Sequence, residues 1–106
     1  MKTITRNEEL ILLSVLQLGS DAYLVAIQEH LSKITEKKIS LTSVHLPLSR
    51  LEKNGLVEGA LGEATAVRGG RRKKIYRITK YGFEALEEHK RISDALWQDY
   101  AKLITR

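Results

Sequence analysis

The residues of this 106-residue chain best suited to binding chemistry are cations gathered in one short stretch. Residues 68–80 contain seven Lys or Arg and no acid, whereas the other 93 residues contain eleven cations and thirteen acids, a net charge of −2. The formal net charge of +5 therefore arises from thirteen residues. Such a localised basic patch is typical of proteins that bind a polyanion. The alternative is a solvated basic loop.

The basic stretch leads directly into residues that favour a β-strand. Residues 69–79 read GGRRKKIYRIT, so that four consecutive cations precede an alternating apolar and polar run. Consecutive like charges repel one another and normally stay loose. We therefore expect the strand to hold these charges against a negative surface such as the phosphates of DNA.

Other reactive residue types form no recognisable site. The chain has no Cys, which excludes disulfides and thiolate zinc ligands. His30, His45 and His89 are too widely spaced to predict a metal site, and we find no Gly-rich phosphate loop, paired carboxylates or activated nucleophile. The sequence thus predicts neither an enzyme nor a cofactor.

The apolar segments and the N-terminus indicate the cellular location of the protein. The longest apolar stretch, residues 10–18, is interrupted by Ser14 and Gln17 and is about half a membrane span. The N-terminus carries acids where a signal peptide would carry its apolar segment. We expect a cytoplasmic protein with no membrane contact.

Helical spacing of apolar residues predicts three short helices before the basic stretch. The first follows the capping-box pattern at Thr5 and ends at Gly19. The second begins with Asp21 as its N-cap and ends in the polar run 35–38. The third starts near Ser40, with a buried stripe of Val44, Leu48 and Leu51, and ends at Asn54-Gly55, where glycine accepts a left-handed backbone.

A hairpin and a last helix follow. Extended segments at 56–61 and 72–78 flank a glycine-containing tip at 62–70, and Thr79 caps a helix over 80–104. Three short helices followed by a hairpin predict a winged helix-turn-helix, in which the third helix enters the DNA major groove. The expected fold class is α+β, mainly helical, with a DNA-binding domain over 1–79 and a C-terminal dimerisation helix over 80–106 in one structural unit.

Two segments of the chain resemble the PadR family of bacterial transcriptional regulators. They are SVHLPLSRLEKNGLVEG at 43–59 and GGRRKKIYRITKYGFEAL at 69–86, and DAYLVAIQEHL at 21–31 resembles the family's second helix. The matching positions are Val44, Leu48, Arg50, Leu51, Glu52, Gly55 and Leu56, and in the wing Gly70, Arg71, Arg72, Lys73, Tyr76, Ile78, Thr79 and Gly82. The short tail suggests the small subfamily with a single C-terminal helix. The resemblance implies a homodimeric DNA-binding repressor, of a kind that small aromatic or lipophilic molecules often release.

The chain departs from the family pattern at three positions. His45 stands where the family usually has a tyrosine that contacts DNA, and Leu24 replaces a common glycine. Pro47 lies inside the recognition helix, where relatives often carry proline one position earlier, and it removes one intrahelical hydrogen bond.

The expected DNA contacts come from two elements. On the third helix they are Thr42, Ser43, His45, Ser49 and Arg50; on the wing they are Arg68, Arg71, Arg72, Lys73, Lys74 and Tyr76. Arginine suits guanine in the major groove. The alternatives are that Ser43 caps the helix and that Arg50 pairs with a local acid.

The last helix is expected to mediate dimerisation. Ile92, Leu96, Tyr100 and Leu103 are spaced by four, four and three residues, on one stripe of a continuous helix. A helix of about 37 Å is too long for three short helices to cover, although packing on its own core is the alternative. Trp97 lies beside the stripe and either lines a ligand pocket or is part of the interface core.

These inferences predict a sequence-specific repressor that binds a palindromic operator as a homodimer and that a small lipophilic or aromatic ligand releases. The alternative is a winged-helix module for protein interaction or non-specific, nucleoid-type DNA binding. Competition by salt and by DNA sequence separates the two.

Overall fold

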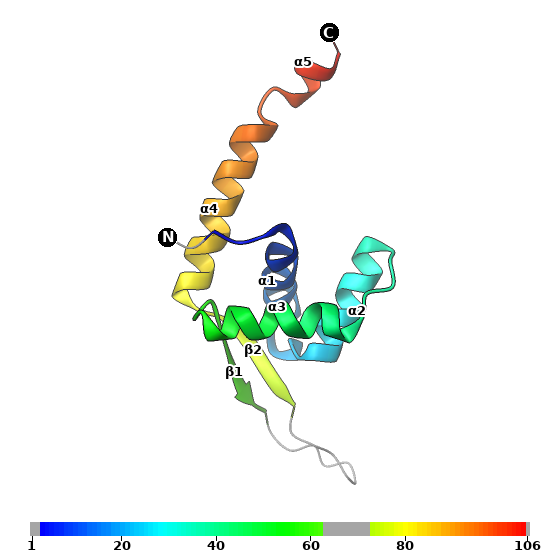
Figure 1. The fold of residues 1–106 in the computed structure, drawn as a ribbon, viewed down its shortest axis with the longest axis vertical. Coiled ribbons are helices and arrows are strands. Elements are labelled where there is room, and N and C mark those ends of the chain that lie inside the picture. The colour runs from blue at the N-terminus through cyan, green and yellow to red at the C-terminus, as the bar shows by residue number, and fades with distance from the viewer. Residues whose placement is uncertain (1–2, 63–72, 106) are drawn as a thin grey trace.

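The computed structural model describes residues 3–62 and 73–105 (Figure 1). Its elements are α1 (Arg6–Leu18), the 3-10 turn η1 (Gly19–Asp21), α2 (Leu24–Thr35), α3 (Leu41–Lys53), β1 (Val57–Leu61), β2 (Lys74–Ile78), α4 (Lys80–Trp97) and α5 (Tyr100–Ile104). This order of three helices, a hairpin and a C-terminal helix confirms the predicted mainly helical winged helix-turn-helix.

The first three helices pack around a common apolar core. Their fully or almost fully buried side chains are Ile11, Leu12 and Val15 of α1, Ile27 and Leu31 of α2, and Val44, Leu48 and Leu51 of α3. The predicted buried stripe of the third helix is therefore confirmed. It fixes the orientation of α3, because the opposite side of the helix must then face away from the core.

Both ends of α3 are capped by local sequence. The Ser40 hydroxyl accepts a hydrogen bond from the backbone N–H of Ser43, at 3.1 Å. At the other end Gly55 has φ of +81°, and the N–H groups of Gly55 and Leu56 donate to the carbonyls of Glu52 and Leu51. This Schellman arrangement ends the helix where Asn54-Gly55 predicted it.

The start of α2 differs from the prediction. Asp21 lies in η1 and does not cap the second helix, which begins only at Leu24. Its N-cap position is Tyr23, whose backbone is extended and whose side chain makes no capping hydrogen bond. Asp21 is the last residue of the 3-10 turn, and the extended backbone at Tyr23 separates this turn from the start of α2.

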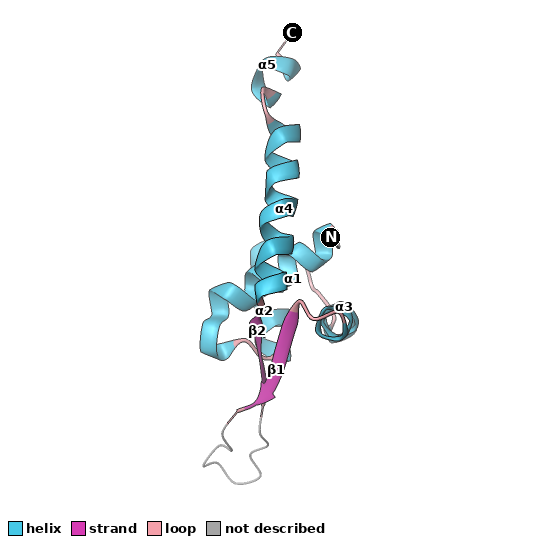
Figure 2. Cartoon of the chain, turned by 90° about the vertical axis from the view of Figure 1, so that its left-hand side faces the viewer, coloured by secondary structure: helices cyan, strands magenta, loops and turns pink. Residues whose placement is uncertain are grey.

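The wing begins as a two-stranded antiparallel sheet. Val57 pairs with Ile78 and Leu61 with Lys74, and the strands run away from the helices (Figure 2). Outside the sheet, the N–H of Tyr76 donates to the carbonyl of Ala22 at 2.8 Å, which ties β2 to the segment before α2. Residues 63–72, which include most of the tip predicted at 62–70 and the first residue of the strand predicted at 72–78, lie outside the described residues.

Thr79 joins three elements at the end of the wing. Its hydroxyl accepts from the N–H of Gly82 and so caps α4, as predicted, and it donates to the carbonyl of Gly55 at 2.5 Å. Its own N–H donates to the carbonyl of Leu56 at 3.1 Å. Thr79, the residue that follows β2, is therefore hydrogen-bonded both to the link between α3 and β1 and to the first turn of α4.

The C-terminal helix is long but not continuous. The helix predicted over 80–104 ends at Trp97, because Gln98 is extended and Asp99 is left-handed with φ of +63°. A second short helix, α5, then continues the chain away from the helical core (Figures 1 and 2). The prediction that Tyr100 and Leu103 continue a stripe of one helix is therefore wrong, since both lie on α5.

Candidate nucleic-acid interface

The exposed face of α3 carries the residues predicted to contact DNA. Thr42, Ser43, His45 and Arg50 are exposed and Ser49 is half-buried. All five lie off the stripe by which α3 packs on the core. With Asn7 of α1, several of them line a shallow hollow of about 340 Å³ on this side of the molecule. The arrangement presents hydroxyl, imidazole and guanidinium groups on an accessible helix.

The structure distinguishes the two alternatives considered for this face. Ser40 caps α3, and the hydroxyl of Ser43 lies 2.8 Å from that of Ser40, so Ser43 supports the cap and remains exposed. Arg50 forms no salt bridge with any residue in the described ranges 3–62 and 73–105. Its guanidinium is therefore not neutralised by a described acid.

One residue of this face does not follow from the sequence-based prediction. Leu46 is 54% exposed, although it is apolar and lies in the middle of α3. The sequence could have indicated this exposure. Leu46 is two residues from both Val44 and Leu48, and a two-residue step turns about 200° around a helix, which places Leu46 opposite these buried residues. Pro47, the next residue, is buried within the helix.

At the root of the wing, two lysines have different partners. The Nζ atom of Lys73 lies 3.9 Å from the centroid of the Tyr23 ring. The Nζ atom of Lys74 lies 2.8 Å from Oε1 of Glu52 in the last turn of α3. The hydrogen bond to Glu52 raises the pKa of Lys74 above its ordinary value. A cation–π contact leaves a lysine charge uncompensated, whereas a carboxylate neutralises it.

The absence of a side chain at Gly59 leaves room for the salt bridge between Glu52 and Lys74. A Cβ atom at Gly59 would overlap with Cε of Lys74 and would lie 3.1 Å from both Oε2 of Glu52 and Cε1 of Tyr76. The bare backbone of β1 thus lets Lys74 cross the strand to reach α3.

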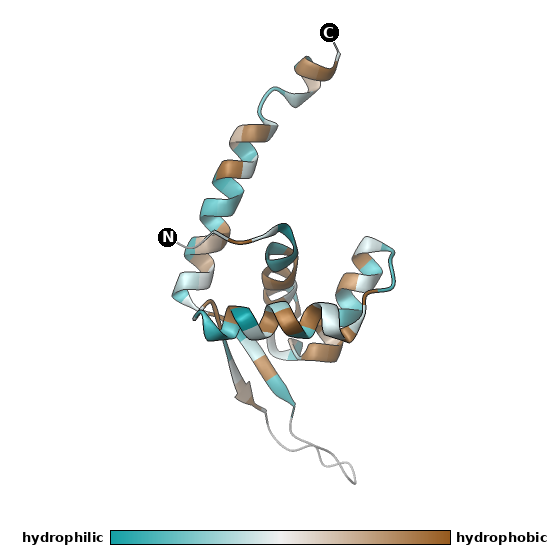
Figure 3. Cartoon of the chain, in the orientation of Figure 1, coloured by the Kyte–Doolittle hydropathy of each residue, from teal (hydrophilic) through white to brown (hydrophobic). Residues whose placement is uncertain are grey.

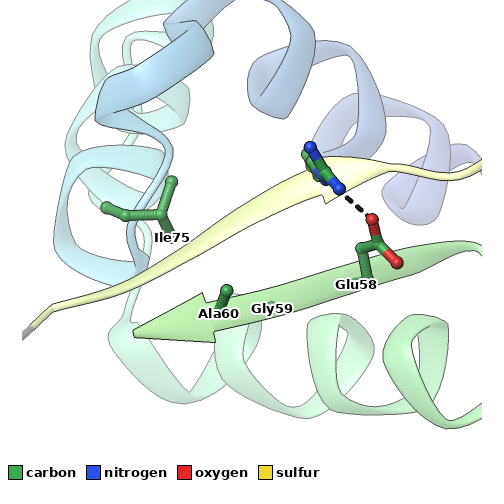
Figure 4. Close-up of a pocket in the computed structure, with 5 residues that line it drawn as sticks. Glu58, Gly59, Ala60 and Ile75 are labelled. Atoms are coloured by element: carbon green, nitrogen blue, oxygen red, sulfur yellow. Dashed lines mark hydrogen bonds and ion pairs between the residues drawn. The ribbon is translucent and has the colours of Figure 1, made fainter. Parts of the chain in front are cut away.

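Tyr76, one of the predicted contacts, is mostly buried. Its side chain is only 6% exposed and belongs to the apolar core, so it has a packing role, and its DNA contact stays a prediction. Burial also raises the pKa of its phenol. The next residue, Arg77, is exposed on the wing and is paired at 2.7 Å with Glu58, the ion pair drawn in Figure 4 beside Gly59, Ala60 and Ile75.

The remaining basic residues of the predicted patch are not described structurally. Arg68, Arg71 and Arg72 lie outside the described residues. Their predicted contacts stay predictions.

The C-terminal helices expose a large apolar surface. The expected dimerisation residues Ile92, Leu96, Tyr100 and Leu103 are all exposed, Leu96 to 80%. Figure 3 shows hydrophobic segments along α4 and in α5, beyond the part that packs on the core. Nearer the core, Leu13 and Leu16 of α1 line a groove of about 410 Å³ with Phe83 of α4.

Trp97 lies at the end of α4 and is exposed. Its ring centroid is 4.8 Å from that of Tyr100, with the planes at 59°. The two rings thus pack across the break between α4 and α5.

Among the described residues there is no group of three or more His, Cys, Asp or Glu arranged to hold a metal ion. The helices of the described ranges include none that is long and apolar enough to cross a membrane.

Comparison with known sequences decides the family. The sequence profile of the "Transcriptional regulator PadR-like family" matches residues 12–88, which include α2, α3, the wing and the first half of α4. The chain belongs to the PadR-like family of transcriptional regulators. No curated protein sequence matches the chain.

Solved structures place this PadR-like regulator among proteins of similar size. A PadR-like transcriptional regulator from Bacillus cereus has a TM-score of 0.73 and 29% identity, covering 93% of this chain and 91% of its own. A transcriptional regulator from Clostridium thermocellum has a TM-score of 0.70 and 25% identity, covering 90% and 89%. A PadR family regulator from Clostridium difficile has the same fold, with a TM-score of 0.60, 23% identity and coverage of 95% and 96%.

Proposed function

We propose that this PadR-like regulator is a cytoplasmic repressor that binds a palindromic operator as a homodimer. The observation that supports this most strongly is the joint placement of α3 and the wing. The Glu52–Lys74 salt bridge holds the root of the wing beside the end of α3, whose polar face is exposed. DNA meets both elements at once in winged helix-turn-helix proteins, with the helix in the major groove.

The side chains of α3 and of the wing are suited to different parts of the DNA. Thr42, Ser43, His45, Ser49 and Arg50 carry the donors and acceptors that read base edges or anchor phosphates. Lys73, together with Arg68, Arg71 and Arg72, supplies the sequence-independent attraction to the backbone. Lys74 contributes mainly to the geometry of the wing, because its charge is shared with Glu52.

A homodimer is supported by the apolar side chains that a single chain leaves uncovered. Ile92, Leu96 and Trp97 of α4 and Tyr100 and Leu103 of α5 are exposed, and the α1–α4 groove adds further apolar surface nearer the core. A large exposed apolar surface of this kind marks an interaction site. A second copy of the chain, related to the first by a two-fold axis, would cover this apolar surface. The same axis would relate the two recognition helices.

We further propose that a planar lipophilic or aromatic ligand binds beside Trp97 and releases the operator. The support is the exposed, tilted pair of Trp97 and Tyr100 at the break between two helices. Ligand binding can change operator affinity only if it favours one dimer geometry over another. Quenching of Trp97 fluorescence by planar dyes is expected to accompany release of the operator, and quenching without release would contradict the regulatory role.

The test of the main proposal is selection of DNA from a random-sequence pool by the purified full chain, followed by competition. Enrichment of a palindrome bound at least about 10³-fold more tightly than random DNA supports an operator-specific regulator. Binding that salt abolishes equally for all sequences would instead identify a non-specific, nucleoid-type module. Reporter transcription in cells with the selected site then shows whether binding represses.

A further inference from the structure

The exposed side chain of Leu46 is out of keeping with its surroundings on α3. Val44, Pro47, Leu48 and Leu51 form the buried stripe of the helix. At about 100° per residue, Leu46 lies some 200° from Val44, almost diametrically opposite the core. It is 54% exposed, so neither the core nor any other described element covers it.

The neighbours of Leu46 place it in the centre of the proposed DNA-facing surface. Thr42 lies one turn before it and Arg50 one turn after it, and all three line the same shallow hollow. Thr42, Leu46, Ser49 and Lys53 follow a spacing of four, three and four residues, which keeps them in one row. A leucine therefore interrupts a row of polar and basic side chains at its midpoint.

The chemistry of the major groove offers one apolar group on a base edge. The four base pairs present donors and acceptors there, and thymine alone adds a C5-methyl group. A leucine side chain has no donor or acceptor, so it can favour a base only by apolar contact. Placed against cytosine, adenine or guanine, the same side chain would desolvate polar atoms without replacing their hydrogen bonds.

We infer that Leu46 is a specificity-determining residue that packs against the C5-methyl group of one thymine in each half-site. This inference rests on the proposed operator binding and names one determinant of its specificity. The hydroxyls of Thr42 and Ser43 and the guanidinium of Arg50 flank the contact and read or anchor the adjacent positions.

Replacement of thymine by uracil tests the contact, because uracil lacks only the methyl group. In the operator selected from random DNA, each thymine is changed to uracil in turn and binding is measured at fixed salt. We expect one position per half-site at which the change weakens binding about fourfold, as for the removal of one buried methyl group. Changes at other thymines should have little effect.

Protein variants then assign the effect to Leu46. Leu46→Ala should bind the thymine and uracil operators equally, whereas Leu46→Met should keep the preference. The matched control is Ile34→Ala, which shortens an equally exposed aliphatic side chain on α2 (56% against 54%) and should leave the preference unchanged. Because Leu46 is exposed, its replacement by alanine, a strong helix former, is expected to leave the fold intact.

The outcomes separate this inference from the proposed function. If no sequence is enriched in the selection, operator-specific binding itself is wrong. If an operator is found but uracil is tolerated at every position, or if Leu46→Ala keeps the thymine preference, only the Leu46 contact is overturned.

Discussion

Nζ of Lys74 in β2 lies 2.8 Å from Oε1 of Glu52 in α3, although the two residues are 22 positions apart in the chain. The pair connects the recognition helix to the wing through side chains as well as through the short link between α3 and β1. Its two side chains are partly exposed, so the free energy it adds to folding is small, about 0–1 kcal/mol. The pair lies where the wing starts and neutralises one of the wing's charges.

The two lysines at the wing root should therefore differ in DNA binding. Lys73→Ala is expected to lower the slope of log K against log salt by about 0.9 for each phosphate that the variant leaves unneutralised. Lys74→Ala should change the slope less, because Glu52 already compensates the charge of Lys74. Titrations of binding against salt measure both, with Lys102→Ala on α5 as the control. Equal slope changes for the two variants would show that the salt bridge opens on DNA.

Arg50 should contribute to sequence specificity. Arg50→Ala is expected to reduce discrimination at one operator position by about 1–3 kcal/mol, as for a bidentate contact to guanine. Arg50→Lys keeps the charge but loses the planar guanidinium group. Compared with Arg50→Ala, it should therefore bind random DNA more tightly but gain little sequence discrimination. A uniform weakening for operator and random DNA would identify Arg50 as a phosphate contact.

Gly82 should be essential for stability. A Cβ atom at this position would overlap with the carbonyl oxygen of Leu56 and would lie 2.6 Å from Cγ2 of Ile78. We expect Gly82→Ala to lower the free energy of unfolding by about 1–3 kcal/mol, despite the better helix propensity of alanine. Gly59→Ala is the comparison and should cost less, because the nearest atom to its Cβ is Cε of the flexible Lys74 side chain and not backbone. Denaturant unfolding compares them, and a Gly82→Ala protein as stable as wild type would refute the packing argument.

Leu96 should control assembly without controlling the fold of one chain. Because Leu96 is 80% exposed, Leu96→Glu is expected to leave the helical content unchanged. In a dimer the same change buries an unpaired carboxylate, which is strongly unfavourable. Sedimentation should show monomers, and operator affinity should fall because each half-site alone is weak. Ala95→Glu on the same helix is the control, and a dimeric Leu96→Glu protein would place the interface elsewhere.

Stability should decline at alkaline pH through Tyr76 and Lys74. Burial raises the pKa of Tyr76 above 10.0, and the hydrogen bond to Glu52 raises that of Lys74 above 10.5. Both groups hold protons more tightly in the folded state, so their stabilisation is complete below about pH 10 and disappears as the pH rises through the folded values.

Tyr76→Phe tests the alkaline prediction. We expect it to make the free energy of unfolding fall less steeply above pH 10, because the buried group no longer ionises. Tyr81→Phe, at an exposed tyrosine, should retain the steep fall. If the two variants behave alike, burial of the phenol is not the cause.

The sequence predicted best where structure depends on local signals. The Thr5 and Thr79 caps and the Asn54-Gly55 stop all act within a few residues, and each is present as expected. The third helix also starts where predicted, although the cap is Ser40 and not Ser43. The break at Gln98 and Asp99 was missed because neither Gly nor Pro marks it: an extended glutamine and a left-handed aspartate produce it.

The site was less predictable than the fold because its details depend on distant residues. Glu52 and Lys74 face each other only after α3 and β2 have packed, and the burial of Tyr76 depends on β2 lying against the helical core. A run of four cations therefore looked like one uniform patch. The structure shows that its last members have different surroundings, with an aromatic ring beside Lys73 and a carboxylate beside Lys74.

The hydrogen bonds of Thr79 connect the start of α4 to the DNA-binding part of the chain. The three bonds join Thr79, the residue after β2, to the link between α3 and β1 and to the first turn of α4, so we expect a tilt of α4 to carry the recognition helix and the wing with it. In a dimer joined at the far ends of α4, a small change of crossing angle would become a larger displacement between the two recognition helices. Since half-sites are read at a separation of about 34–36 Å, one threonine would thereby transmit the geometry of the dimer to the register on DNA.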